Sequence, residues 1–338
     1  MGLRARPMRP EDVSVCVGLV AQHPVIGSRY GNAIKDLGPS WLRSVGSEAF
    51  QAVVYEEVEG TQVTVWGLGV GVFVNDNFVR AIKAPPLFWF GPELARRVVR
   101  GHSPLLSDKE VRDANSFEGL NLLVWEAFPC PNFAGRADVY HLMVKTYIEC
   151  YRGFLLKEMI TSQSEGAERL QWSMDSGGMF WDAVEGRYQS RLGKEPALVF
   201  EQPHLVGITR ELEAGRPGSW VGVLFNYQPP RLLFTRGEQR LLLSALPGRT
   251  DEELSGDLGI SLSTVKNLWR SIYNRAAPRL QELPLDYPRE DMGVAQRGRE
   301  KKRRLLAYLR EHPEELRPVS RKLLQHSPDK GDPRRSGS

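Results

Sequence analysis

Six polar side chains around residue 270 have the types and the spacing to contact a polyanion. They are Ser263, Thr264, Lys266, Asn267, Arg270 and Asn274. Ser261 is a favourable N-cap residue, so we expect a helix to begin there. The opposite side of this helix is apolar and consists of Val265, Leu268, Trp269, Ile272 and Ala276. Donors on the polar side can form hydrogen bonds with phosphates and with base edges.

Two shorter helices are expected just before this one. Thr235 and Glu238 have the spacing of a capping box ahead of an apolar run, so the first helix begins there. Thr250 and Glu253 repeat the spacing, and Gly259 suits the left-handed residue that follows a helix. We therefore expect an all-α domain over residues 229–283, with a tight turn between its second and third helices.

The segments GRTDEELS and LGISLSTVKN in this domain resemble the LuxR type of helix-turn-helix, also called the NarL or GerE type. In that family the helix that begins Ser-x-x-Thr-Val-Lys lies in the major groove of DNA. The resemblance implies that Lys266, Asn267 and Arg270 approach the DNA and that Thr264 lies near a phosphate. Leu268 departs from the family pattern, which often has histidine at this position.

This resemblance implies a cytoplasmic bacterial regulator of transcription that is not an enzyme. Its expected partners are double-stranded DNA, RNA polymerase, a second copy of the chain and an unknown effector, without a membrane or a cofactor. Residues 1–228 are then a sensory or partner-binding α+β domain. A scaffold that contacts only proteins remains a further alternative.

The region 1–228 alternates strand-like and helical patterns, which indicates an α+β domain of one or two lobes. We expect a hairpin over 50–57 and 62–74 and a buried strand over 120–128. Helices are expected from about residue 10, over 93–99, from 138 to about 163, and over 167–174. Two further strand-like runs cover 197–200 and 220–227. The glycines of GLGVG lie inside the second hairpin strand, which favours a packing role over a nucleotide-binding loop.

An acyltransferase-like enzyme that carries a helix-turn-helix accessory domain is the alternative function. The opening RPMRPEDVSVCVGLV, followed by paired strands, is similar to the start of GNAT-type acetyltransferases. Those enzymes bind the pyrophosphate of acetyl-CoA on a Gln/Arg-x-x-Gly-x-Gly/Ala loop at a helix N-terminus. Tyr151-Arg152-Gly153-Phe154 does not match this loop, so no phosphate-binding segment is predicted.

The remaining titratable residues predict neither a catalytic nor a metal site. Cys16, Cys130 and Cys150 form no CxxC pair, and no two histidines have the spacing of neighbours on one helix face. The acids Asp138, Asp175 and Asp182, with Ser173 and Ser176, form no recognisable triad. We therefore name no catalytic residue.

Basic residues are concentrated in the expected tail, residues 284–338. From residue 297 to the end there are 13 Lys and Arg against 6 Asp and Glu, although the whole chain carries only +4. The run of basic residues from 297 to 304 leads into Leu305, Leu306 and Leu309. We expect a short amphipathic helix that docks these leucines on the protein, and phosphate contacts are an alternative role for the basic run. Residues from 328 onward are expected to be disordered.

No membrane-spanning or secretory segment is predicted. The longest nearly apolar run, residues 63–74, is shorter than the roughly 20 residues that a spanning helix needs. The start MGLRARPMRPEDV is not followed by the apolar stretch of a signal peptide.

Overall fold

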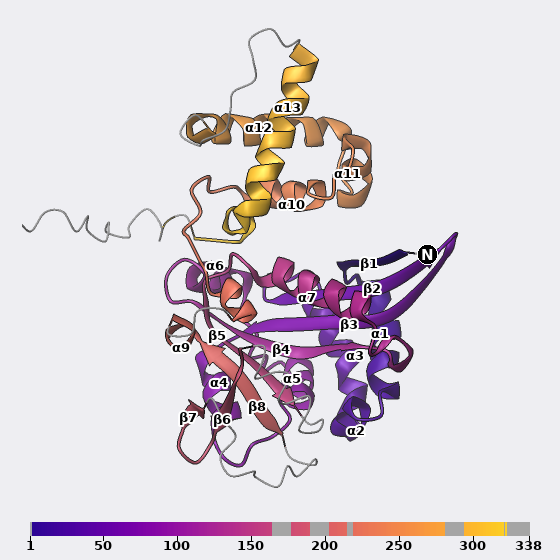
Figure 1. Cartoon of the computed structure of the whole chain (residues 1–338), viewed down its shortest axis with the longest axis vertical. Coiled ribbons are helices and arrows are strands. Elements are labelled where there is room, and N and C mark those ends of the chain that lie inside the picture. Colours follow the sequence, from indigo (N-terminus) through magenta and orange to yellow (C-terminus); the bar gives the residue numbers. More distant parts are fainter. Residues whose placement is uncertain are drawn as a thin grey trace, which may run out of the picture. The chain divides into compact units, whose positions relative to one another are not determined.

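The computed structural model describes residues 2–163, 177–189, 203–214, 219–280, 294–320 and 322. The chain forms two compact units, Met1–Asn226 and Tyr227–Ser338, each of which is described by itself (Figure 1).

The first unit is built on an eight-stranded sheet with the order β1-β2-β3-β4-β5-β8-β6-β7. The strands are β1 (Gly2–Pro7), β2 (Phe50–Glu59), β3 (Gln62–Val74), β4 (Leu120–Pro129), β5 (Leu156–Gln163), β6 (Met179–Asp182), β7 (Arg187–Gln189) and β8 (His204–Thr209). Neighbouring strands are antiparallel except β4 and β5, which are parallel. The α+β architecture expected for this region is therefore observed.

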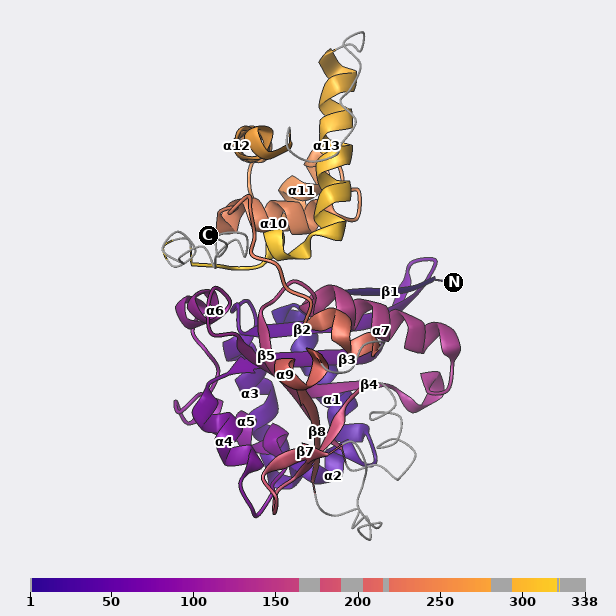
Figure 2. The same ribbon diagram turned by 60° about the vertical axis from the view of Figure 1, so that its left-hand side comes forward.

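Helices cover both faces of this sheet (Figures 1 and 2). One face packs against α1 (Val13–Gln22), α2 (Ile26–Tyr30), α3 (Ile34–Ser44), α4 (Asp76–Lys83) and α5 (Phe90–Val99). The other face packs against α6 (Asp108–Ala114), α7 (Ala137–Tyr151) and the 3-10 helix η4 (Trp220–Leu224). Short 3-10 turns η1 (Pro10–Asp12), η2 (Gly31–Ala33) and η3 (Pro131–Phe133) and the helix α9 (Arg210–Ala214) complete the described elements.

Several sequence predictions for this unit are confirmed. The hairpin β2–β3, the strand β4 and the helix α5 lie where the patterns place them. Gly71, one of the glycines of GLGVG, packs closely against α7: a Cβ atom there would lie 2.1 Å from the hydroxyl oxygen of Tyr151. These glycines therefore serve packing, as expected.

Two predictions for this unit are wrong. The helix expected from 138 to about 163 ends at Tyr151, because Gly153 takes a φ of +88° and turns the chain into β5. The run 220–227, expected as a strand, contains η4 instead, since Trp220, Val221 and Leu224 pack against α7 and its neighbours rather than joining the sheet. The helix expected over 167–174 and the strand over 197–200 lie outside the described residues.

The described residues of the second unit form helices α10 (Arg236–Ala245), α11 (Asp251–Leu258), α12 (Leu262–Leu280), α13 (Val294–Glu311) and the 3-10 helix η5 (Pro313–Leu316). Both expected capping boxes are present, Thr235 with Glu238 and Thr250 with Glu253. Gly259 is in the left-handed conformation at the end of α11, as expected. Apolar residues of all four helices form one core, which includes Leu241, Leu254, Val265, Trp269 and Leu309.

Helix α13 belongs to this core, which confirms the docking expected for its leucines. Leu305 and Leu309 are fully buried. Its basic residues are largely paired: Glu300 binds both Arg303 and Arg304, and the ammonium of Lys302 lies 3.0 Å from Asp251 Oδ1. The same ammonium lies 4.7 Å from the ring of Trp269, which adds a cation–π contact.

None of the described helices is both long enough and apolar enough to cross a membrane.

Candidate functional site

Strands β4 and β5 separate toward their carboxyl ends. They are paired from Leu120 with Leu156 to Val124 with Thr161. Beyond that point β4 continues to Pro129 beside β3 alone, while Ser162 and Gln163 of β5 pair with β8. In mixed sheets, ligands bind outside the carboxyl ends of parallel strands, where neighbouring connections diverge. The divergence of β4 and β5 is therefore the first indication of a site.

A β-bulge lies in β4 directly after this point. In the pairing with β3, Val70 faces Glu126 and Gly71 faces Val124, so Trp125 is the extra residue. A bulge re-aims the side chains on either side of it. Here it turns the neighbouring residues Trp125 and Glu126 toward the same helix, α2, whereas consecutive residues of a regular strand point to opposite faces.

The side chains of Trp125, Glu126 and Tyr30 form a buried hydrogen-bonded chain. Trp125 Nε1 donates to the hydroxyl of Tyr30 at 3.0 Å, and that hydroxyl donates to Glu126 Oε1 at 2.7 Å. Tyr30 is 2% exposed and Glu126 is 7% exposed. Burial raises the pKa of Tyr30 well above its usual value, and the negative charge of Glu126 raises it further. Tyr30 therefore remains a neutral donor that orients the carboxyl group of Glu126.

Gly91, in the first turn of α5, allows this chain to form. A Cβ atom at Gly91 would lie 2.7 Å from the hydroxyl of Tyr30 and 3.2 Å from Glu126 Oε1. Any larger residue would displace one of the two polar groups. The sequence patterns predicted the helix around 93–99 but did not indicate this contact, because the three residues come from distant parts of the chain.

The segment between β4 and α7 exposes backbone donors at a helix N-terminus. Residues 134–138 are exposed, and α7, which has 15 residues, has no side-chain cap. Within the described residues we find no acceptor for the backbone N–H groups of Gly135, Arg136 and Ala137, whereas that of Asp138 donates to its own carboxylate. Gly135 has a φ of +82°, and the space where its side chain would be is open. Such a group of free N–H donors favours an anionic ligand.

An aromatic stack holds this segment in place. The rings of Tyr55 and Trp66 are stacked at 5.2 Å, and those of Trp66 and Phe133 at 5.1 Å. The guanidinium carbon of Arg136 lies 5.3 Å from the centre of the Phe133 ring. The backbone N–H of Cys130 also donates to the carbonyl oxygen of Trp66 at 2.7 Å. The exposed donors are thus carried on a segment whose other side is anchored to the sheet.

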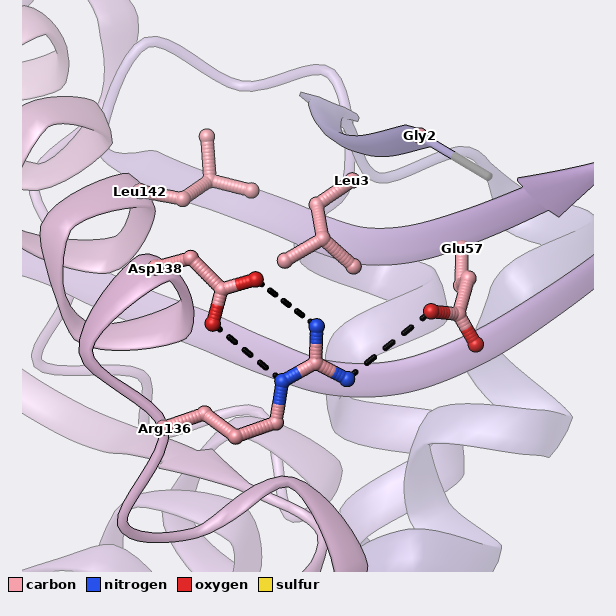
Figure 3. A pocket seen from close by; sticks show the side chains of 6 residues that line it. All are labelled: Gly2, Leu3, Glu57, Arg136, Asp138 and Leu142. Carbon is pink, nitrogen blue, oxygen red and sulfur yellow. Dashed lines mark hydrogen bonds and ion pairs between the residues drawn. The ribbon is translucent and has the colours of Figure 1, made fainter.

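A hollow of about 310 Å³ lies beside the first turn of α7 (Figure 3). It is lined by Gly2, Leu3, Glu57, Arg136, Asp138 and Leu142. Figure 3 shows the guanidinium of Arg136 between the carboxylates of Asp138, at 2.7 Å, and Glu57, at 3.8 Å. The hydrogen bonds from Arg136 hold the pKa of Asp138 below its usual value. Because the two acids already face the guanidinium, this hollow positions Arg136 and does not itself offer an anion site.

The segment 132–137 partly matches the GNAT loop. Asn132-Phe133-Ala134-Gly135-Arg136-Ala137 has the glycine and the alanine of that loop at the required spacing, with Asn in place of Gln or Arg. It also precedes a helix. The segment 151–154, by contrast, lies at the end of α7 and leads into β5. Residues 132–137 therefore match the loop better than residues 151–154 do, and phosphate binding by this segment stays a proposal.

The six residues predicted to contact DNA lie together on α12. Ser263, Thr264, Lys266, Asn267, Arg270 and Asn274 are all exposed. Val265, Trp269, Ile272 and Ala276 on the other side are buried, and Leu268 is half-buried. The guanidinium of Arg270 donates to Asn267 Oδ1 at 3.3 Å. The two-sided helix is therefore observed, while DNA contact by its polar side stays a prediction.

In the described part of the chain, no group of three or more His, Cys, Asp or Glu residues is placed to hold a metal ion.

Comparison with known proteins returned solved structures but no sequence relative. No family model matches the chain, and no curated protein matches it. A variant of spermidine N-acetyltransferase from Vibrio cholerae is 10% identical, with a TM-score of 0.34, over 61% of this chain and 94% of that protein. An uncharacterised protein from Bacillus halodurans is also 10% identical, with a TM-score of 0.34, over 66% of this chain and 91% of its own.

The function predicted from the sequence is corrected. The two structures are titled an N-acetyltransferase and an uncharacterised protein, and neither title names a DNA-binding regulator, so the prediction of a transcription regulator that is not an enzyme is not retained. The error has a physical origin. Helix caps at 235 and 250 are local signals, and they carry no information about a site that the sheet assembles from distant residues.

Proposed function

We propose that the unit Met1–Asn226 is an acyltransferase that uses an acyl-CoA donor, and that the unit Tyr227–Ser338 is a helix-turn-helix accessory domain. The observation that carries this proposal is the divergence of the parallel strands β4 and β5 next to the exposed N-terminus of α7. The first feature is a place where an extended ligand can enter between two strands. The second offers donors for a diphosphate.

The donor's pyrophosphate binds to the N–H groups of residues 135–137. The residues present fit this ligand: the donors are exposed, Gly135 leaves the approach open, and the helix dipole adds positive potential. Arg136 and Asp138 together add no net charge, since they pair with each other. Affinity therefore depends mainly on backbone groups, which is why Gly135 matters more than any single charged side chain.

The pantetheine arm and the thioester then extend along β4. Beyond Val124 β4 is no longer paired with β5, and the arm enters where the two strands separate. This placement brings the thioester toward the bulge at Trp125 and Glu126. Peptide N–H groups in such a position stabilise the negative charge that develops on a thioester oxygen.

Glu126 acts as the general base for an acceptor amine. The amine nitrogen attacks the thioester carbonyl, the new C–N bond forms, the C–S bond breaks, and CoA leaves as a thiolate that takes up a proton. The nitrogen loses its proton to the Glu126 carboxylate, which Tyr30 holds in place at 2.7 Å. An amine suits this base, because the ammonium formed on attack is far more acidic than a free hydroxyl group.

A titration of the full-length chain with CoA tests the proposal. We expect saturable CoA binding, and we expect Gly135→Glu to weaken it at least about tenfold. The new carboxylate would repel the pyrophosphate, and a residue with a Cβ atom would be strained at the positive φ of position 135. Gly101→Glu is the matched control: Gly101 also has a positive φ, +80°, in open space, but it follows α5 on the other face. Absence of CoA binding, or equal losses in both variants, would rule the proposal out.

The second unit is proposed as a helix-turn-helix because α11 and α12 are joined by a short turn at Gly259 and share a core with α10. Its resemblance to the LuxR type supports this assignment. Double-stranded DNA, RNA polymerase and a second copy of the chain stay predictions for this unit.

A further inference from the structure

His23 lies at the corner between α1 and α2, and its backbone ends one helix and begins the other. Its N–H donates to the carbonyl oxygens of Leu19 at 3.1 Å and Val20 at 3.2 Å, which closes α1. Its own carbonyl oxygen accepts a hydrogen bond from the N–H of Gly27 at 2.8 Å, the first bond of the turn that leads into α2. Pro24 follows directly, in the position where the start of a helix favours proline.

The imidazole ring of His23 caps this turn. Its Nδ1 atom accepts hydrogen bonds from the backbone N–H groups of Val25 at 3.3 Å and Ile26 at 3.2 Å. Because both partners are donors, Nδ1 carries no proton in this arrangement. The first N–H groups of a helical segment have no partner inside it, and the ring supplies the acceptor for two of them. The side-chain oxygen of asparagine commonly has this role.

The same ring contacts the strand that carries Glu126. The ring centres of His23 and Phe128 lie 4.8 Å apart in an edge-to-face arrangement. Phe128 is two residues beyond Glu126 on β4, so both side chains lie on the same face of the sheet. His23 therefore contacts both elements that form the buried hydrogen bond between Tyr30 and Glu126: α2, which ends at Tyr30, and β4.

Other contacts hold the body of α2. Ile26 and Tyr30 are buried in the core, and the guanidinium carbon of Arg29 lies 4.7 Å from the centre of the Trp89 ring. A Cβ atom at Gly27 would lie 2.5 Å from a carbonyl oxygen at the end of α1, so the two helices pack tightly at the corner. These contacts keep α2 folded when the cap is lost. Because α2 has only five residues, an uncapped start is expected to displace its last residue slightly.

We propose that His23 is a positioning residue for the acyl transfer: it caps the turn into α2 and thereby fixes the hydroxyl of Tyr30 on the carboxylate of Glu126. This inference rests on the proposed function, in which Glu126 is the general base. It does not require His23 to contact the acyl donor or the amine. A misplacement of about 1 Å at a reacting group can lower a rate about 10²-fold, so a smaller displacement of Glu126 should still be visible in kcat.

Substitutions of His23 in the full-length chain test the cap. His23→Ala removes it, whereas His23→Asn keeps it, because Oδ1 of asparagine is as many bonds from the backbone as Nδ1 of histidine. His102→Ala is the control, since His102 is an exposed histidine after α5. With acetyl-CoA and n-butylamine, we expect kcat to fall about tenfold in His23→Ala and to recover most of this loss in His23→Asn. The affinity for CoA should stay within about twofold of the wild type in all three variants.

The indole N–H signal of Trp125 gives a measurement that does not depend on turnover. Trp125 Nε1 donates to the hydroxyl of Tyr30 at 3.0 Å, so the chemical shift of this N–H group reports the position of the hydroxyl. Comparison with Trp125→Phe identifies its signal among those of the eight tryptophans. We expect the signal to move in His23→Ala, to return toward the wild-type position in His23→Asn, and to stay unchanged in His102→Ala.

An unchanged Trp125 signal in His23→Ala, or a His23→Asn protein as impaired as His23→Ala, would overturn the proposal. If circular dichroism shows that His23→Ala does not fold, His23→Gln takes its place, because its amide oxygen lies one bond farther from the backbone. Absence of CoA binding by the wild type would contradict the proposed function and not the cap, which the Trp125 signal tests by itself.

Discussion

The hydroxyl of Tyr30 lies 2.7 Å from Glu126 Oε1, although 96 residues separate the two in the chain. Tyr30 ends α2, and Glu126 follows the bulge of β4. The contact joins the helical layer on one face of the sheet to the strand that borders the divergence from β5. It therefore places an oriented carboxylate next to the proposed acyl donor.

Glu126→Gln should abolish most acyl transfer while CoA binding remains. The amide cannot accept the proton of the acceptor amine, so kcat should fall about 10²–10⁴-fold. Release of the CoA thiol in the presence of primary amines measures the rate, and a CoA titration measures binding. Tyr30→Phe leaves the carboxylate in place and should reduce kcat less. Full turnover by Glu126→Gln would remove the base assignment.

Asp12→Asn should destabilise the first unit at neutral pH by about 2 kcal/mol, because Arg6 would lose its bidentate, charge-assisted hydrogen bonds to the carboxylate. Arg6 donates to the two carboxylate oxygens of Asp12 at 2.6 and 2.8 Å, and these bonds hold the pKa of Asp12 below its usual value of 3.8.

The pH dependence of this effect follows from the direction of the shift. Because the pKa of Asp12 is lower in the folded state than its usual value of 3.8, the stabilisation is complete at pH values above 3.8. It is lost as the pH falls through the lower, folded-state pKa. The difference in unfolding free energy between the wild type and Asp12→Asn should therefore shrink only in that acidic window. Urea unfolding at several pH values measures it, and a difference that stays constant into strong acid would contradict the assignment.

Val265→Asp should unfold the second unit, because Val265 is fully buried among α10, α11 and α12. An unpaired carboxylate at this position costs several kcal/mol. Circular dichroism and hydrogen exchange over 236–276 would report the loss. Lys266→Asp introduces the same group at the exposed neighbouring position and should leave the fold intact. A folded Val265→Asp protein would show that α12 is rotated from the orientation described.

Lys266→Ala and Arg270→Ala should change the stability of the second unit by less than about 0.5 kcal/mol, since both side chains are exposed. If the predicted DNA contacts are made, each variant also weakens retention on double-stranded DNA and lowers the salt slope of log K by about 0.9. Arg240→Ala, an exposed arginine on α10, serves as the control. Equal retention by all three variants and the wild type would exclude these contacts.

The sequence by itself determined the elements whose signals are local. The capping boxes at Thr235 and Thr250, the left-handed Gly259 and the two-sided pattern of α12 each depend on residues within a few positions of one another. The hairpin β2–β3 is equally local, since its two strands are adjacent in the sequence and are joined by a short turn. Backbone propensities and side-chain periodicity decide such features before any distant contact forms.

The tertiary structure decided the features that depend on distant partners. The segment 156–163 has apolar residues at helical spacing, yet it is a strand, because β4 and β8 supply its hydrogen bonds. The pairing of Tyr30 with Glu126 needs the bulge in β4 and the absence of a side chain at Gly91. The hydrogen bonds from the N–H groups of Arg231 and Leu232 to Glu315 likewise join residues more than 80 positions apart. No local sequence pattern encodes these contacts, because the two partners come within bonding distance only after the sheet or the helical core has folded.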